Sequence, residues 1–303
     1  MRTQFCEALV ARAKDSSLVF LTGDLGFMAL EPLRDALGAR FINAGVAEQN
    51  MISVAAGLAK QGFDAWTYSI APFIYARAFE QIRNDVTFHD LPVRLVGNGG
   101  GYGYGVMGPT HHAIEDYGVL LTLPGLKAFA PVFDEDVSHV IDRLSAESGP
   151  TYLRLGRGEA PSGYQVPRYA PWRCLVQGPG PVVIAVGPLA GSYISSCLSM
   201  PQDRRPSLWA LAELPLESSP IPHALAAQIA TARRLIVAEE HVARGSFGSE
   251  LARNLMMSGH GLERFVHLSA TSHHLSGYGS QSFMRKKSKL DPAALVAAVE
   301  ALS

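Results

Sequence analysis

The sequence GVAEQNMISVAAGLAKQG, residues 45–62, decides how the first half of this chain folds. Its apolar residues recur at helical spacing, at Met51, Val54, Leu58 and Ala59. The small residues 55–57 allow a neighbouring backbone to approach closely. We therefore expect a tightly packed helix whose first turn carries one carboxylate, Glu48. On position alone this side chain either faces water and offsets the helix dipole, or is buried and binds a ligand.

On both sides of this helix, apolar strand patterns alternate with helical ones. The strand-like segments are SLVFLTGD (17–24), FINAG (41–45), DAWTY (64–68), PVRLVGN (92–98), KAFAPV (127–132) and TYLRL (151–155). Helical patterns begin near residues 47, 75, 113 and 134. Such alternation predicts an α/β fold with a mainly parallel sheet covered by helices on both faces.

A second unit of the same kind follows a segment rich in proline. Residues 161–181 contain five prolines and show no periodicity. The strand patterns then resume with PVVIAVG (181–187), SLWALA (207–212), RRLIVAEE (233–240) and RFVHL (264–268), and the chain closes on a helix over 291–302. We therefore predict a first domain over residues 1–160, a linker over 161–180 and a second α/β domain over 181–303.

The composition indicates a globular chain without a polyelectrolyte partner. A formal net charge of −1 and 48% hydrophobic residues over 303 positions give no reason to expect binding to nucleic acid or a membrane surface. We interpret Arg-Lys-Lys at 285–287 as a solvated patch. The cysteines suggest neither disulfides nor a metal site, because they are few and widely spaced, at Cys6, Cys174 and Cys197. The N-terminus lacks the apolar core of a signal peptide, so we expect a cytoplasmic protein.

Five ordered blocks of this chain resemble the thiamine diphosphate-dependent transketolase family. The blocks are GVAEQNM with AAGLA at 45–62, YSIAPFIYARAFEQIRND at 68–85, GPTHHAIED at 108–116, TYLRLGRG at 151–158 and EEHVARGSFGSE at 239–250. They span nearly the whole chain. The resemblance implies a pyrimidine-binding domain followed by the transketolase C-terminal domain.

The resemblance also implies a cofactor site in the first domain. Glu48 matches the glutamate that hydrogen-bonds the aminopyrimidine ring nitrogen of thiamine diphosphate and favours its imino tautomer, which then takes the thiazolium proton. Phe73 matches the aromatic wall that stacks on this ring, and Ile70 occupies a place where relatives often carry another aromatic ring. Asp24 matches a pocket residue near the subunit interface; the alternative for it is a turn or a helix cap.

Further residues match substrate contacts of the family. His111 in GPTH corresponds to an active-site histidine near the reacting carbon, where it moves protons or holds a developing alkoxide. The adjacent His112 is expected to be structural, so the pair is not interpreted as a metal site. The glycine-rich segment 97–108 lies over the substrate channel in the family, and Tyr102 and Tyr104 are expected to shape that channel. The alternatives are a weak phosphate cradle or an ordinary surface loop.

Two departures from the family pattern concern sugar recognition. Met107 stands where transketolases carry an aspartate that reads a substrate hydroxyl, and Gly99 replaces a histidine that helps to hold the sugar phosphate. Arg157 and Arg2 match basic phosphate contacts of the family. A phosphorylated acceptor is therefore one expectation, and a surface ion pair is the alternative for Arg157.

The chain lacks the GDG segment and following asparagine that hold magnesium and diphosphate in this family. The resemblance therefore implies a separate diphosphate-binding subunit that carries Mg²⁺, and no metal site in this chain. We expect a heterotetramer built around a symmetric pair of these chains. The activity implied is transfer of a two-carbon ketol unit from a ketose to an aldose-type acceptor. The alternatives are the beta subunit of a 2-oxoacid dehydrogenase decarboxylating component, or a non-catalytic stabilising partner.

Overall fold

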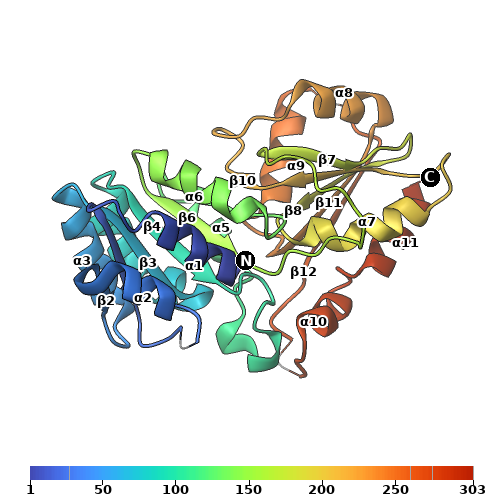
Figure 1. The fold of residues 1–303 in the computed structure, drawn as a ribbon. Helices are drawn as coiled ribbons and strands as arrows, with labels where there is room; N and C mark the ends of the chain where they lie inside the picture. Colours follow the sequence, from blue (N-terminus) through green and yellow to red (C-terminus); the bar gives the residue numbers. More distant parts are fainter. Residues whose placement is uncertain (27, 260, 275, 303) are drawn as a thin grey trace.

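The computed structural model describes residues 1–26, 28–259, 261–274 and 276–302. The N-terminal and C-terminal parts of the chain each build one β-sheet with helices against it (Figure 1). The predicted fold class, two mainly parallel sheets flanked by helices, is confirmed. Within these ranges no helix is long and apolar enough to cross a membrane.

The first sheet has seven strands in the order β10-β5-β6-β4-β3-β1-β2. Their bounds are β1 Leu18–Thr22, β2 Phe41–Asn43, β3 Asp64–Ile70, β4 Val93–Asn98, β5 Lys127–Phe129, β6 Thr151–Leu155 and β10 Glu213–Leu214. All pairs are parallel except β10 with β5. Every residue of β1 and β6 is buried, as expected for strands that helices cover on both faces.

Side chains alternate between two apolar layers on this sheet. On one face, Phe20 and Trp66 pack against α1 Arg2–Ala11, α2 Glu31–Leu37 and α6 Asp136–Ala146. On the other face, Leu21 and Ala65 pack against α3 Glu48–Lys60, α5 Asp116–Leu120 and the π-helical turns η2 Phe73–Arg77 and η3 Ile82–Thr87. The helix expected over 75–85 is thus irregular: α4 Phe79–Gln81 separates two π-helical turns. Three 3₁₀ turns complete this half, η1 Gly38–Arg40, η4 Gly105–Met107 and η5 Pro109–His111.

The second sheet has five strands in the order β12-β11-β8-β9-β7, and only β7 runs antiparallel to its neighbour. The strands are β7 Trp172–Val176, β8 Val182–Val186, β9 Ser207–Leu211, β11 Arg234–Val242 and β12 Arg264–Ala270. The helices are α7 Leu189–Ser199, α8 His223–Ala232, α9 Phe247–Met257, α10 Gln281–Lys287 and α11 Pro292–Leu302. The edge strand β7 lies inside the segment 161–180 that the sequence suggests is a linker, and the exact domain boundaries stay a prediction.

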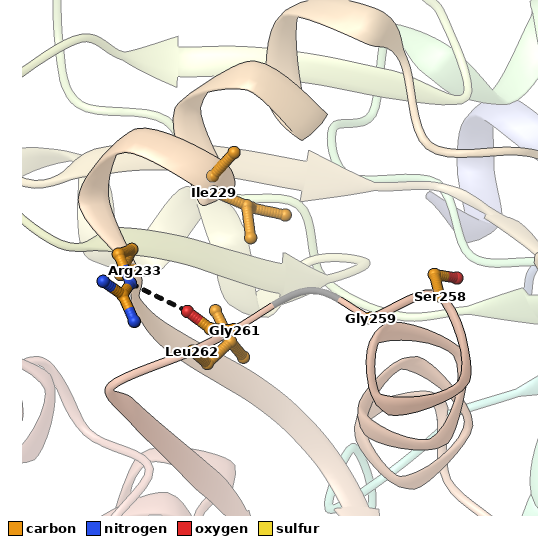
Figure 2. Close-up of a pocket in the computed structure, with 7 residues that line it drawn as sticks. Ile229, Arg233, Ser258, Gly259, Gly261 and Leu262 are labelled. Atoms are coloured by element: carbon orange, nitrogen blue, oxygen red, sulfur yellow. Dashed lines mark hydrogen bonds between the residues drawn. The ribbon is translucent and has the colours of Figure 1, made fainter.

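A shallow hollow of about 350 Å³ lies at the amino ends of β11 and β12 (Figure 2). Ile229 and Leu262 supply apolar walls, and Arg233 donates a hydrogen bond from Nε to the Gly261 carbonyl at 2.8 Å. The Arg233 guanidinium also pairs with Glu263 at 3.5 Å. In parallel sheets ligands bind at the carboxyl ends of the strands, so this hollow lies at the wrong edge for a cofactor.

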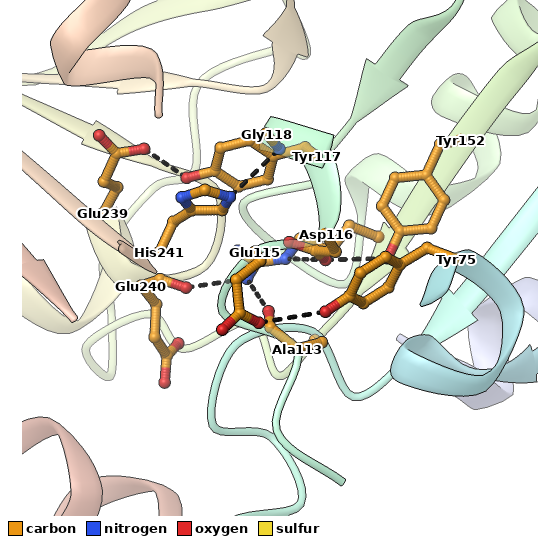
Figure 3. A network of polar contacts seen from close by, with 12 residues as sticks. Tyr75, Ala113, Glu115, Asp116, Tyr117, Gly118, Tyr152, Glu239, Glu240 and His241 are labelled. Atoms are coloured by element: carbon orange, nitrogen blue, oxygen red, sulfur yellow. Dashed lines mark hydrogen bonds and ion pairs between the residues drawn. The ribbon is translucent and has the colours of Figure 1, made fainter. Parts of the chain in front are cut away.

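A network of buried polar contacts joins the two halves of the molecule (Figure 3). Arg154 on β6 donates from Nε to Asp116 at 2.8 Å, and Tyr152 donates to the same carboxylate oxygen at 2.8 Å. The guanidinium also donates to the carbonyls of Ala113 and Glu240, each at 2.9 Å. Because Glu240 belongs to β11, this one side chain connects the first sheet to the second.

The interpretation of 285–287 as a solvated patch is wrong for its first residue. Arg285 lies buried in α10, and its Nη2 donates to Glu240 at 3.1 Å. Only the two lysines that follow are exposed. The local sequence contains no sign of this pair, because its partner carboxylate is 45 residues away.

A second polar link between the halves is formed by Glu115 and His273. His273 Nε2 lies 2.7 Å from the Glu115 carboxylate, which also accepts a hydrogen bond from Tyr75 at 3.1 Å. The hydrogen bond to Glu115 raises the pKa of His273 above its usual value. Burial alone would raise the pKa of Glu115, but the hydrogen bond to His273 holds it below its usual value. Each partner therefore stabilises the charged form of the other.

The buried pair predicts a large loss of stability when one partner is removed. Asp116→Ala leaves the Arg154 charge buried without its carboxylate, so we expect the free energy of unfolding in urea to fall by about 3–5 kcal/mol. The control is Asp142→Ala, which breaks an exposed pair with Arg12 and is expected to cost less than about 1 kcal/mol. Equal losses for the two variants would contradict this interpretation.

The Glu115–His273 pair predicts a defined pH window. The contribution of His273 is complete below the usual histidine pKa of 6.5 and is lost as pH rises through the raised value. The contribution of Glu115 is complete above its usual pKa of 4.5 and is lost as pH falls through the lowered value. The difference in unfolding free energy between wild type and His273→Asn should therefore be largest from about pH 5 to 6 and shrink toward pH 9. The control is His89→Asn, at an exposed histidine that makes no ion pair among the described residues. A difference in unfolding free energy that does not depend on pH for His273→Asn would refute the assignment.

Candidate active site

The strand order of the first sheet reverses between β1 and β3. From β1 the chain moves outward to β2, crosses back to β3 and then continues in the opposite direction to β4. Ligands in open α/β sheets bind outside the carboxyl ends of the strands at such a reversal. Asp24 follows β1, Glu48 begins the helix after β2, and Ile70 ends β3. Three residues singled out in the sequence thus meet at this edge.

The Glu48 carboxylate is buried, with 2% of its surface exposed, which excludes the solvent-facing alternative. It is the first residue of α3, after a turn in which Gly45 has a φ of +71°. One oxygen, Oε2, accepts a hydrogen bond from Arg77 Nη1 at 2.7 Å. The other, Oε1, accepts a longer bond from the Ser69 hydroxyl at 3.4 Å. The structure therefore holds a buried, partnered carboxylate at the reversal of the sheet.

Phe73 lies beside this carboxylate at the start of η2 and is half-buried. The Arg77 guanidinium carbon lies 4.3 Å from the centre of the Phe73 ring, a cation–π distance. Arg77 thus contacts both Glu48 and Phe73. The sequence analysis missed this arginine; its spacing of four residues from Phe73 in a segment with a helical pattern was the signal available.

His111 packs edge-on against Phe73, with ring centres 5.1 Å apart. Its Nδ1 lies 2.9 Å from the Thr110 hydroxyl. Burial lowers the pKa of His111 below the usual value, so the imidazole is mainly neutral at pH 7. His112 points elsewhere and is fully buried, with Nε2 3.4 Å from the Gly105 carbonyl. The described residues include no group of three or more His, Cys, Asp or Glu arranged to hold a metal.

Tyr104 joins the aromatic group around His111, whereas Tyr102 does not. The Tyr104 ring lies 6.2 Å from the His111 ring, and its hydroxyl accepts a hydrogen bond from Asn98 at 2.6 Å. Tyr102 is fully buried, and its hydroxyl donates to the Ser272 carbonyl at 2.6 Å. Burial raises the pKa of Tyr102 to about 12. Tyr102 thus anchors its loop to the second domain, and its part in shaping a channel stays a prediction.

The glycine-rich segment packs against buried charges at Gly100 and Gly101. A Cβ atom on Gly100 would lie 2.4 Å from the Arg154 side chain, and one on Gly101 would lie 2.7 Å from the Glu240 side chain. The backbone amide of Tyr102 donates to the Glu240 carboxylate at 3.1 Å. The glycines are therefore required by close packing at the junction of the two sheets.

The remaining predicted residues lie around the same edge. Asp24 is exposed and accepts a hydrogen bond from Asn43 at 3.1 Å; both line a hollow of about 370 Å³. Ile70 is partly exposed at the end of β3, and Met107, at the end of η4, is 55% exposed. These positions place Asp24 and Met107 where a ligand or a partner chain has access to them.

Arg2 and Arg157 are exposed near the carboxyl end of β6. The amide of Gly156 donates to the Met1 sulfur at 3.4 Å, which brings the start of α1 beside the segment that carries Arg157. Neither arginine makes an ion pair with any residue that the structure describes, so the surface-pair alternative for Arg157 is not supported. Two guanidinium groups without an ion-pair partner among the described residues therefore lie near the carboxyl end of β6.

A family model described as "Transketolase, pyrimidine binding domain" matches residues 1–162. All the residues of the candidate site lie within this range. Among the curated relatives, the chain is 32% identical over 166 residues to one subunit of the apulose-4-phosphate transketolase of Phocaeicola vulgatus, covering 54% of this chain and 53% of the relative. It is 34% identical over 194 residues to a putative transketolase C-terminal section of Methanocaldococcus jannaschii, covering 62% and 61%. The matches thus span about half the length of these relatives.

Solved structures are similar over nearly the whole chain. A structure described as "Split gene transketolase, inactive beta4 tetramer" superposes with a TM-score of 0.84 at 26% identity, covering 99% of this chain and 97% of that one. The transketolase of Leishmania mexicana superposes with a TM-score of 0.78 at 19% identity and covers 99% of this chain but 45% of its own, which shows a shared fold. The resemblance found in the sequence is thereby confirmed: this chain belongs to the transketolase family, and it contains a match to the family's pyrimidine-binding domain over residues 1–162.

Proposed function

We propose that this chain is a subunit of a thiamine diphosphate-dependent transketolase that transfers a two-carbon ketol unit from a ketose to an aldose-type acceptor. The observation that carries the proposal is the buried Glu48 carboxylate beside the Phe73 ring, at the reversal of a sheet in the family's pyrimidine-binding domain. Two side chains of this kind fit a pyrimidine ring: a buried carboxylate binds a ring nitrogen, and an aromatic ring binds a ring face. When bound, thiamine diphosphate supplies the electron sink that cleavage of a ketose carbon–carbon bond requires.

Glu48 holds a proton at the pyrimidine ring nitrogen. Its Oε1 has only one long hydrogen bond, to Ser69, and so retains lone pairs for this contact. Phe73 orients the ring by stacking. Burial of the carboxylate keeps water from competing for the same oxygen, which strengthens the interaction.

His111 moves the proton of a substrate hydroxyl. Its lowered pKa leaves the imidazole neutral at pH 7, so it accepts a proton as the hydroxyl of the donor sugar becomes a carbonyl. Tyr104 and Met107 form the substrate side of this histidine. Arg2 and Arg157 bind the phosphate of a phosphorylated sugar, because guanidinium groups recognise phosphate bidentately.

We further propose that another chain supplies the diphosphate-binding half and its Mg²⁺. The support comes from relatives named as subunits of transketolases and from the split-gene structure that matches this chain end to end. We expect two copies of each chain in a cytoplasmic heterotetramer. The carboxylates of the present site serve the pyrimidine, and none of them is assigned to the metal.

Mixing this chain with a separate diphosphate-binding subunit tests whether the active site needs both chains. This chain alone should show no ketol transfer, and the mixture with a subunit carrying the diphosphate-binding half, thiamine diphosphate and Mg²⁺ should show it with at least one ketose of a donor panel. The measurement is aldose-dependent consumption of the ketose. Tight cofactor binding and turnover by this chain alone would refute the proposed division, and decarboxylation of a 2-oxoacid in place of ketol transfer would favour the dehydrogenase alternative.

Glu48→Gln tests the catalytic assignment. In the assembled complex we expect the turnover number to fall by about 10²–10⁴-fold, because the amide cannot exchange a proton with the ring nitrogen. The control is Glu80→Gln, an exposed glutamate of α4 in the neighbouring segment, which should leave turnover unchanged. An unchanged rate in Glu48→Gln would mean that this chain is a silent partner.

A further inference from the structure

Arg77 contacts both groups that the proposed function assigns to the pyrimidine ring. Its Nη1 lies 2.7 Å from Glu48 Oε2, and its guanidinium carbon lies 4.3 Å from the centre of the Phe73 ring. Glu48 belongs to α3, whereas Phe73 and Arg77 belong to η2. The Arg77 side chain therefore connects α3 to η2 and restricts the distance between Glu48 and Phe73.

The contact leaves one carboxylate oxygen of Glu48 available. Oε2 is used by Arg77, while Oε1 has only the Ser69 hydroxyl at 3.4 Å. A Cβ atom on Gly23 would lie 3.8 Å from Oε1, so the glycine leaves ordinary contact space on that side. An ionised carboxylate has about four acceptor sites, and a bond to Arg77 occupies one of them. The guanidinium thus orients the carboxylate and leaves Oε1 available to a ligand.

The charge of Glu48 also needs this arginine. The carboxylate is 2% exposed, and among the described residues Arg77 is its one ion-pair partner. A buried carboxylate without a partner is strongly disfavoured, and a guanidinium is charged at every accessible pH. Arg77 itself is 44% exposed, so its own desolvation costs little when the pair forms.

We propose that Arg77 is a positioning residue for thiamine diphosphate: it compensates the charge of Glu48 and fixes this carboxylate and the Phe73 ring in the relative geometry that the pyrimidine requires. The inference rests on the proposed function. Lysine would supply the charge but not the flat surface that lies on Phe73, so the two basic residues are not equivalent here.

The same geometry has one competing interpretation. The Arg77 guanidinium lies on the Phe73 ring and donates to Glu48, and a bound pyrimidine ring would make the same two contacts. In this interpretation Arg77 occupies the position of the cofactor and must move away before the cofactor binds. The two interpretations predict opposite changes in the affinity for thiamine diphosphate when Arg77 is removed. Removal of a positioning residue weakens cofactor binding, whereas removal of a competitor strengthens it.

The test is calorimetric titration of thiamine diphosphate with Mg²⁺ into the assembled complex. We expect Arg77→Gln to raise the dissociation constant by about tenfold, a typical coupling for a contacting charged pair, and Arg77→Lys to recover part of the loss. In a Glu48→Gln background, Arg77→Gln should have a clearly smaller further effect, because only the contact with Phe73 is then left to lose. The matched control is Arg83→Gln, an exposed arginine of η3 in the same segment. At saturating thiamine diphosphate, the turnover number of Arg77→Gln should lie closer to that of the wild type than the turnover number of Glu48→Gln does.

Several outcomes would overturn the inference. Tighter binding in Arg77→Gln would mean that the arginine competes with the cofactor. An equal loss in the Glu48→Gln background would mean that it does not act through the carboxylate, and unchanged binding would mean that it does not act on the cofactor. If the wild-type complex binds no thiamine diphosphate, the proposed function fails and the inference fails with it. The free energy of unfolding in urea is measured for each variant, so that a change in cofactor binding is not mistaken for misfolding. Arg77→Met serves as a second substitution at the same position if Arg77→Gln does not fold.

Discussion

The buried charge of Arg154 is the constraint on which the junction of the two domains depends. A guanidinium away from water needs acceptors around it, and here three come from two segments: the Ala113 carbonyl and the Asp116 carboxylate from one, and the Glu240 carbonyl from β11 (Figure 3). The glycine-rich loop must pass close to this side chain, which explains why residues larger than glycine do not fit at Gly100. The segment that ends in His111 is therefore held between the two sheets by the partners of one arginine.

The candidate site lies next to this junction but is built by a different principle. Parallel strands bring their carboxyl ends to one edge, and the strand order reverses there between β1 and β3. At this reversal α3 delivers Glu48 and η2 delivers Phe73 and Arg77. The π-helical turns of this segment change the direction of successive side chains, as they often do at functional sites. The site is thus positioned by the first sheet, while the second domain fixes the loop that carries His111.

The sequence predicts those parts of this structure that depend on local patterns. Among the described residues, apolar runs of strand length locate every strand except β7 and β10, helical periodicity locates α3, α5, α6 and α11, and the start of α3 is correct to within one residue. It does not predict β7, because proline-rich flanks hide a short edge strand, or the two-residue β10, which pairs with a strand more than 80 residues earlier. For the site, the resemblance to the transketolase family indicates Glu48, Phe73 and His111. The burial of Tyr102 and Arg285 and the contacts of Arg77 depend on partners distant in the chain, which no local pattern contains.

The departures from the family pattern are coupled by packing. Gly99, one of the two departures that the family resemblance implies, has a φ of +77°, which favours glycine. A Cβ atom on this residue would lie 2.2 Å from the ring of Tyr104. That ring in turn is fixed by the hydrogen bond from Asn98 to its hydroxyl and by its contact with His111. A side chain at position 99 and Tyr104 in its present place are therefore mutually exclusive. A histidine at position 99 would therefore displace Tyr104 from its contact with His111.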